Sequence, residues 1–84
     1  MYLIEYSSKW FKFWDNIPRE ERERISKKLL ELKEKKSFRH LKLGSPYFVL
    51  EVGQYRVCFI EEESKRILLF VGNHKEYEKW IGLK

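Results

Sequence analysis

Residues 46–72 read PYFVLEVGQYRVCFIEEESKRILLFVG, and this stretch decides the fold. It contains three runs rich in β-branched and aromatic residues: PYFVLEV, YRVCFIEE and KRILLFVG. GQ joins the first two runs and EESK joins the last two, and connections this short link neighbouring antiparallel strands. The stretch therefore predicts a three-stranded meander. Residues 67–71 are apolar at every position, so we expect both faces of the third strand to be covered.

The preceding residues predict one strand and two helices. YLIEY at residues 2–6 favours a short strand, and Ser7 or Ser8 could cap the helix that follows it. The apolar positions of this helix recur at helical spacing and are Trp10, Phe13, Trp14 and Ile17. Pro18 suits the first turn of a second helix over residues 18–36. The apolar stripe of the second helix consists of Ile25, Leu29 and Leu32.

The element order is thus β-α-α-β-β-β, with a short helix or tail over residues 74–84. This order predicts an α+β fold in which the two N-terminal helices pack largely on one face of a twisted antiparallel sheet. Because chains rarely divide at this size, residues 1–84 should form a single domain.

The formal charge of +5, from 18 Lys and Arg against 13 Asp and Glu, favours an anionic partner, although solubility alone also calls for net charge. The single cysteine, Cys58, cannot form an intrachain disulfide, which fits a reducing, cytoplasmic setting. The sequence has neither a signal peptide nor a membrane-spanning run, so we expect no membrane association. It also lacks metal-ligand spacings and phosphate-binding glycine loops, so we expect no metal ion and no small-molecule cofactor.

The most one-signed part of the chain is EKKSFRHLKLG, residues 34–44. Its candidate RNA-binding residues are Lys36, Arg39, His40 and Lys42. Two interpretations stay open. These side chains can form a solvated helix end that complements the helix dipole, or they can follow a phosphate backbone.

Arg56 interrupts the apolar pattern of the second meander strand. A charge among apolar neighbours needs a partner or a position at a cleft. One alternative is an ion pair with Glu51 across the hairpin. The other is an exposed guanidinium directed at a phosphate group.

GNHKEY follows the third meander strand, a position where rigid scaffolds often present functional groups. His74 can exchange protons near neutral pH, Lys75 can neutralise a phosphate, and Tyr77 can stack on a base or donate a proton. The same residues also suit the first turn of a helix capped by Asn73. The two interpretations are compatible.

The order of elements, together with RHLKLGSPYFVLEVGQYRVCFI (residues 39–60) and ILLFVGNHKEY (residues 67–77), resembles the RelE/ParE superfamily of toxins from type II toxin–antitoxin systems. The resemblance extends over nearly the whole chain. The RelE-like branch implies a metal-independent mRNA interferase, an endoribonuclease that cuts mRNA in the ribosomal A site and is neutralised by a cognate antitoxin. Its chemistry is attack of a ribose 2′-hydroxyl on the adjacent phosphate, which needs a base, cations and a proton donor.

The resemblance also implies roles for individual residues. Arg56 matches the family's strand arginine and would stabilise the scissile phosphate, while His74 would act as general acid or base. Lys75 falls with His74 where the family places basic residues after the last strand, and Tyr77 lies near the family's tail tyrosine. Lys42 matches a basic position ahead of the meander and would, with Lys75, hold the RNA backbone.

The sequence departs from the family pattern at two positions. Many ribonuclease members carry basic residues where this chain has Val49 and Glu51, and a glutamate there repels RNA. The departure favours an alternative function: a non-catalytic member, either a ParE-like inhibitor of DNA gyrase or an inactive relative that only binds an antitoxin. A plain RNA-binding domain is a third possibility. An antitoxin is expected to bind the aromatic helix of residues 10–14 or the tail at Trp80 and Ile81.

Overall fold

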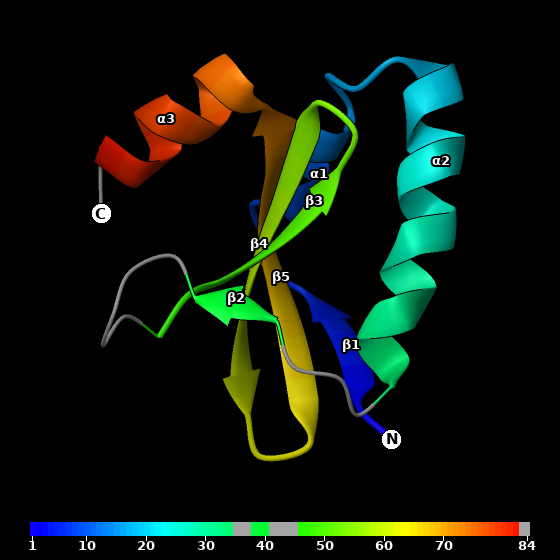
Figure 1. The fold of residues 1–84 in the computed structure, drawn as a ribbon, viewed down its shortest axis with the longest axis vertical. Coiled ribbons are helices and arrows are strands. Elements are labelled where there is room, and N and C mark those ends of the chain that lie inside the picture. The colour runs from blue at the N-terminus through cyan, green and yellow to red at the C-terminus, as the bar shows by residue number, and fades with distance from the viewer. Residues whose placement is uncertain (35–37, 41–45, 83–84) are drawn as a thin grey trace.

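The fold is a five-stranded sheet with helices, seen in a computed structural model that describes residues 1–34, 38–40 and 46–82 (Figure 1). Its elements, in chain order, are β1 (Leu3–Tyr6), α1 (Trp10–Trp14), α2 (Arg19–Leu29), the 3-10 helix η1 (Leu30–Lys33), β2 (Arg39–His40), β3 (Phe48–Val52), β4 (Tyr55–Glu62), β5 (Lys65–Asn73) and α3 (His74–Gly82). The α+β class and the three meander strands are those that the sequence predicts. Within the described ranges, no helix has the length and apolar character needed to cross a membrane.

The strand order across the sheet is β1-β5-β4-β3-β2. β3, β4 and β5 pair antiparallel, which confirms the meander. The structure adds two details to the predicted sheet. β2 is a two-residue strand beside β3. β1 pairs with β5 in parallel, and the long connection that such a pair needs is supplied by the helices and by β2, β3 and β4.

The β3–β4 turn depends on a glycine. Gly53 has φ of +60°, a conformation that side chains with a Cβ rarely adopt. A Cβ at this position would also lie 2.3 Å from Nη2 of Arg24 on α2. Glycine thus permits both the tight hairpin and the close approach of Arg24 to its backbone.

Helices cover both faces of the sheet, so the molecule has two cores (Figure 1). α2 lies on one face, while α1 packs on β5 and its Phe13 contacts both cores. The first core is formed by Trp10, Ile17, Ile25, Leu29, Leu32, Leu50, Val52, Val57, Phe59, Leu68 and Val71. α3 lies on the opposite face, where its Trp80 packs on Val49, Cys58 and Phe70. The segment after β5, for which the sequence predicts a short helix or tail, is a helix over His74–Gly82 with Trp80 as its buried anchor.

A β-bulge explains how β5 serves both cores. Cys58 pairs with Phe70 while Phe59 pairs with Leu68, so Leu69 is the extra residue on β5. Residues two apart on a regular strand share one face. The bulge breaks this alternation, and Leu68 enters the first core whereas Phe70 enters the second. The expectation that both faces of residues 67–71 are covered is confirmed.

The helix ends differ from the expected caps. No side chain of the described N-terminal segment caps α1; instead the backbone N–H of Trp10 donates to the carbonyl of Ser7 at 3.1 Å. The predicted capping by the Ser7 or Ser8 hydroxyl is wrong, because the backbone already closes this turn. Pro18 stands at the N-cap of α2, one position before the expected first turn. The predicted stripe is confirmed, since Ile25, Leu29 and Leu32 are buried.

Cys58 is expected to resist alkylation at pH 8 while the chain is folded. Burial raises the pKa of its thiol from 9.0 to about 12, against a smaller lowering by Arg56, and only the thiolate reacts readily. Since the folded state holds this proton more tightly, the Cys58 contribution to stability is complete below pH 9 and is lost as the pH rises toward 12. Mass spectrometry after iodoacetamide treatment, with and without guanidinium chloride, checks the first point. Rapid labelling without denaturant would contradict it.

Candidate active site

Arg56 on β4 lies directly opposite Glu51 on β3 in the strand register. Nη1 of Arg56 donates to Oε2 of Glu51, and the two side chains form an ion pair. The Arg56 side chain is 20% exposed and that of Glu51 is 48% exposed. Of the two alternatives for Arg56, the ion pair across the hairpin is present. Because both side chains are partly exposed, this pair lies at the surface of the sheet.

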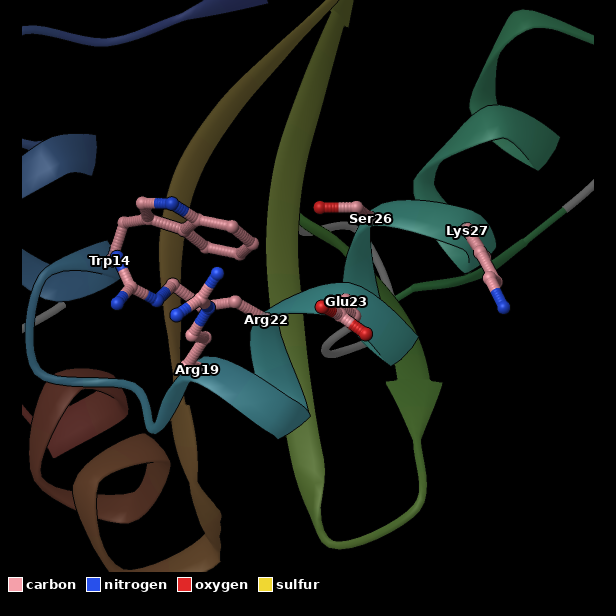
Figure 2. Close-up of a pocket in the computed structure, with 6 residues that line it drawn as sticks. All are labelled: Trp14, Arg19, Arg22, Glu23, Ser26 and Lys27. Atoms are coloured by element: carbon pink, nitrogen blue, oxygen red, sulfur yellow. The ribbon is translucent and has the colours of Figure 1, made fainter.

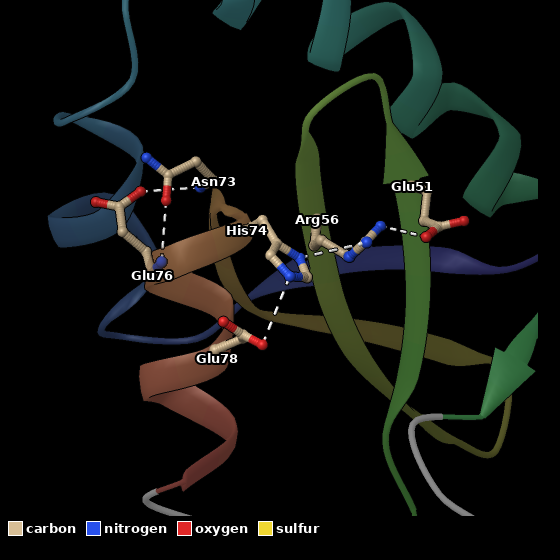
Figure 3. A network of polar contacts seen from close by, with 6 residues as sticks. All are labelled: Glu51, Arg56, Asn73, His74, Glu76 and Glu78. Atoms are coloured by element: carbon tan, nitrogen blue, oxygen red, sulfur yellow. Dashed lines mark hydrogen bonds and ion pairs between the residues drawn. The ribbon is translucent and has the colours of Figure 1, made fainter.

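His74 is the second group at this position. Its Nδ1 lies 3.5 Å from Nη2 of Arg56, and its Nε2 lies 3.5 Å from Oε2 of Glu78. Figure 3 shows the resulting row of side chains, which runs from Glu51 through Arg56 and His74 to Glu78. A guanidinium can only donate, so Nδ1 is assigned as the acceptor and the proton of the neutral ring is assigned to Nε2.

A reciprocal cap holds His74 in place. The backbone N–H of Glu76 donates to Oδ1 of Asn73, and the N–H of Asn73 donates to Oε1 of Glu76, both at 2.9 Å (Figure 3). This capping box fixes the turn from β5 into α3. A Cβ at Gly72 would lie 2.7 Å from the ring of Phe70 and 3.0 Å from Cβ of Glu76, so the turn also requires a glycine. The predicted cap at Asn73 is confirmed.

Tyr77 supports the row from the side of α3. The guanidinium carbon of Arg56 lies 5.3 Å from the centroid of the Tyr77 ring, within cation–π range. The rings of His74 and Tyr77 are 6.4 Å apart. Lys75 is exposed on the first turn of α3 and takes part in none of the described polar contacts of this group. The structure thus brings together three of the predicted catalytic residues.

The predicted RNA-binding residues are described only in part. Lys36 and Lys42 lie outside the described residues. The backbone of Arg39 and His40 forms β2, which pairs with β3 at the edge of the sheet. Arg39 and His40 therefore lie on the edge strand next to the one that carries Glu51.

Sequence reasoning missed one member of the row. Glu78 faces His74 from the next turn of α3, a contact that the i,i+4 spacing on a helix could have indicated. Among the described residues, no three His, Cys, Asp or Glu side chains lie close enough to hold a metal ion. The row can accept or donate protons and can stabilise a negative charge.

A second basic surface lies on the opposite face of the sheet, between α1 and α2. It is an open hollow of about 730 Å³ lined by Trp14, Arg19, Arg22, Glu23, Ser26 and Lys27. In Figure 2, Arg19 and Arg22 lie beside the Trp14 ring. The hollow offers cations for an anionic partner but no imidazole. The groups suited to proton transfer near neutral pH are therefore those around His74.

Comparison with known proteins gives a likeness of fold. No protein-family model matches the chain, and no curated protein matches its sequence. The isolated RelE toxin of E. coli is 17% identical, with 99% of this chain and 98% of that chain covered and a TM-score of 0.74. A chain of the RelB–RelE antitoxin–toxin complex of Methanococcus jannaschii is 17% identical, with 90% and 96% covered and a TM-score of 0.72.

A further similar structure is a copper-bound mutant toxin from Helicobacter pylori, which is 18% identical, with 90% of this chain and 98% of that chain covered and a TM-score of 0.71. The likeness thus extends over nearly the whole length of both chains, in proteins of three different organisms. The chain has the fold of the RelE toxins.

Proposed function

We propose that the chain is the toxin of a toxin–antitoxin pair and that it cuts mRNA on the ribosome without a metal ion. The observation that carries this proposal is the contact of Arg56 with His74, 3.5 Å apart, at the surface where β4 meets α3. Cleavage by the adjacent 2′-hydroxyl passes through a phosphorane with added negative charge. Arg56 would stabilise that charge, and His74 would transfer a proton.

The remaining predicted residues would bind RNA around this pair. Lys75 follows His74 directly and is exposed, so it can reach a neighbouring phosphate. Tyr77 holds Arg56 through its ring. The RNA backbone would be followed by the basic residues Lys36, Arg39, His40 and Lys42.

The antitoxin would bind a groove between α1, β5 and α3. This groove has a volume of about 680 Å³, and its lining includes the apolar side chains Phe13, Leu69, Phe70 and Trp80 and the basic side chains Lys9, Lys12 and Lys79. Trp10 and Trp80 themselves are only 1% and 7% exposed, so an antitoxin would contact the groove and not these rings in full. An apolar floor with a basic rim fits an acidic amphipathic segment. Similar folds are known in RelB–RelE complexes from M. jannaschii and E. coli.

The purified chain is expected to cut mRNA in a translating extract, leaving a 2′,3′-cyclic phosphate and a 5′-hydroxyl. Primer extension and end-group analysis locate and identify the cuts. Arg56→Ala and His74→Ala should both cut far more slowly, while Lys33→Ala, an exposed change in η1, should not. Adding a small acidic protein encoded beside this chain should stop cleavage. If both site variants cut as fast as the parent, the site assignment is wrong.

One observation favours a non-catalytic function: Glu51 already occupies the guanidinium that would bind phosphate. Growth arrest with intact mRNA and damaged DNA would select a ParE-like action on gyrase. No effect on growth would select an inactive relative that binds an antitoxin. Salt-dependent RNA binding off the ribosome, without cleavage at any pH, would select a plain RNA-binding domain.

A further inference from the structure

The open hollow between α1 and α2, named the Trp14 hollow, has an excess of positive charge. Three basic side chains line it, and none of the described ion pairs or side-chain hydrogen bonds involves them: Arg19, Arg22 and Lys27. The other two basic residues of α2 are paired, since Arg24 and Lys28 each contact a glutamate three residues away, at 2.7 and 2.8 Å. The lining holds one carboxylate, that of Glu23, against the three cations. The hollow therefore attracts an anionic ligand.

Arg22 supplies a second sign of a ligand. Its Nε is buried and has no hydrogen-bond partner among the described residues. Buried donors without an acceptor are rare in folded proteins and occur where an ion or a ligand binds. Figure 2 shows the Arg19 and Arg22 side chains together on the Trp14 side of the hollow. Because a guanidinium presents its donors as a planar fork, each of the two can bind two oxygens of one phosphate group.

Trp14 gives the hollow an aromatic wall. Its ring stacks on the buried Trp10, with 5.7 Å between the ring centroids, so its orientation is fixed by the core. The side chain is partly exposed and lines the hollow. An aromatic surface beside two guanidinium groups suits a nucleotide strand, in which planar bases alternate with phosphates. An acidic peptide offers negative charge without this alternation, so the lining favours RNA.

The Trp14 hollow adjoins the surface that leads to the candidate active site. Lys27 also lines a second hollow of about 470 Å³, whose lining includes Arg24 and Lys28 of α2 and Glu51 of β3. Glu51 belongs to the row of side chains at the candidate active site (Figure 3). An RNA strand that leaves that site can therefore continue along α2 to the Trp14 hollow.

We propose that the Trp14 hollow is a second RNA-binding site, in which Arg19 and Arg22 hold phosphate groups and the Trp14 ring contacts a base. Lys27 would hold the phosphate that lies between this site and the second hollow. The inference goes beyond the proposed function, because the site contributes no group to the cleavage chemistry and can bind RNA without cutting it.

Intrinsic fluorescence reports on this site directly. Trp10 and Trp80 are only 1% and 7% exposed, so quenching by a stacked base should come from Trp14. The probe is a single-stranded RNA of about 12 nucleotides, a usual length for a single-strand site. It should quench the parent chain, and Trp14→Phe should abolish the quenching. Arg56→Ala should keep the full quenching at saturation, because Arg56 does not line the hollow.

The double variant Arg19→Ala/Arg22→Ala should bind this RNA about tenfold more weakly at low salt. Its plot of log K against log[salt] should be shallower by about 1.4, since each lost phosphate contact accounts for about 0.7 on a single strand. Arg22→Lys keeps the charge but not the fork, so it should weaken binding and preserve the salt slope. Fluorescence titrations at several salt concentrations give both quantities.

The matched control is Lys33→Ala/Lys65→Ala. It removes the same amount of positive charge from two side chains that do not line the hollow, and it should leave affinity and salt slope close to those of the parent. Circular dichroism confirms that each variant is folded.

If the folded arginine variant binds RNA as tightly as the lysine control, the inference is overturned. Adenosine 5′-monophosphate that quenches Trp14 at concentrations as low as the RNA does would also overturn it, because the hollow would then hold a free nucleotide. Equal quenching by a polyglutamate peptide of the same charge would instead make the hollow a protein-docking surface. Since all these readouts measure binding, a parent chain that binds RNA here but does not cut mRNA contradicts only the proposed function.

Discussion

Arg66→Ala is expected to lower the free energy of unfolding by about 3–5 kcal/mol, because it removes a buried guanidinium that pairs with Glu61 and also satisfies two backbone carbonyls. Arg66 is 1% exposed and is the buried charged residue among the described parts of the chain. Its Nε and Nη2 contact Oε2 of Glu61 at 2.9 and 2.8 Å. Its Nη1 donates to the carbonyls of Leu32 and Glu34, both at 3.0 Å. Arg66 thus ties β5 to the end of the helical layer.

Alanine would leave these acceptors without their donor. An unsatisfied buried acceptor costs about 1–3 kcal/mol. The guanidinium carbon also lies 3.9 Å from the centroid of the Tyr2 ring and 4.9 Å from that of Phe38, and these contacts would be lost as well. Since small domains are stable by only about 5–15 kcal/mol, the variant should be marginally folded.

Urea denaturation followed by tryptophan fluorescence measures the effect. Arg66→Lys should fall between the parent and Arg66→Ala, because lysine keeps the charge but cannot reach the carbonyls and the carboxylate together. Arg19→Ala removes an exposed arginine and should change stability by no more than about 0.5 kcal/mol. A loss below about 1 kcal/mol for Arg66→Ala would show that the carbonyls find water or other donors.

The sequence could not reveal this buried arginine. Its position, just after EESK, is typical of a solvated hairpin end. Two of its partners are the backbone carbonyls of Leu32 and Glu34, which are 34 and 32 residues away in the chain and have no side-chain signal. The parallel pairing of β1 with β5 could not be predicted for the same reason, since the local sequence of a strand does not show which distant strand it pairs with.

Short-range sequence patterns, in contrast, predicted the meander and the positions of Arg56 and His74 in the site. Arg56 lies opposite Gly72 in the register, so the segment after β5 had to pass near the guanidinium. The placement of His74 then follows from the capping box of Asn73 and Glu76, which has the expected spacing of three residues. The bulge at Leu69 was not predictable, because its apolar neighbours fit either face. The ion pair of Glu51 with Arg56 was one of two alternatives that the sequence left open for this arginine.

His74→Ala is expected to slow cleavage by about 10²–10⁴-fold, the usual contribution of a positioned proton donor. The assignment of His74 as the proton donor to the 5′-oxygen can be tested by changing that leaving atom. An mRNA with sulfur in place of the scissile 5′-oxygen releases a thiolate, which needs no proton donor. His74→Ala should therefore cut this substrate nearly as fast as the parent does. Single-turnover rates on both substrates provide the measurement.

Arg56→Ala is the matched comparison. The arginine contacts the His74 imidazole, but its proposed role is to stabilise the negative charge on the phosphorane oxygens and not to protonate the leaving group. The phosphorane oxygens carry their negative charge whether the leaving atom is oxygen or sulfur. Arg56→Ala should thus stay slow on both substrates, whereas His74→Ala recovers only on the sulfur substrate. If sulfur fails to restore His74→Ala, then His74 does not protonate the leaving group. Its 3.5 Å contact with Arg56 would then serve to position the guanidinium, and the proton donor would have to be sought elsewhere on α3.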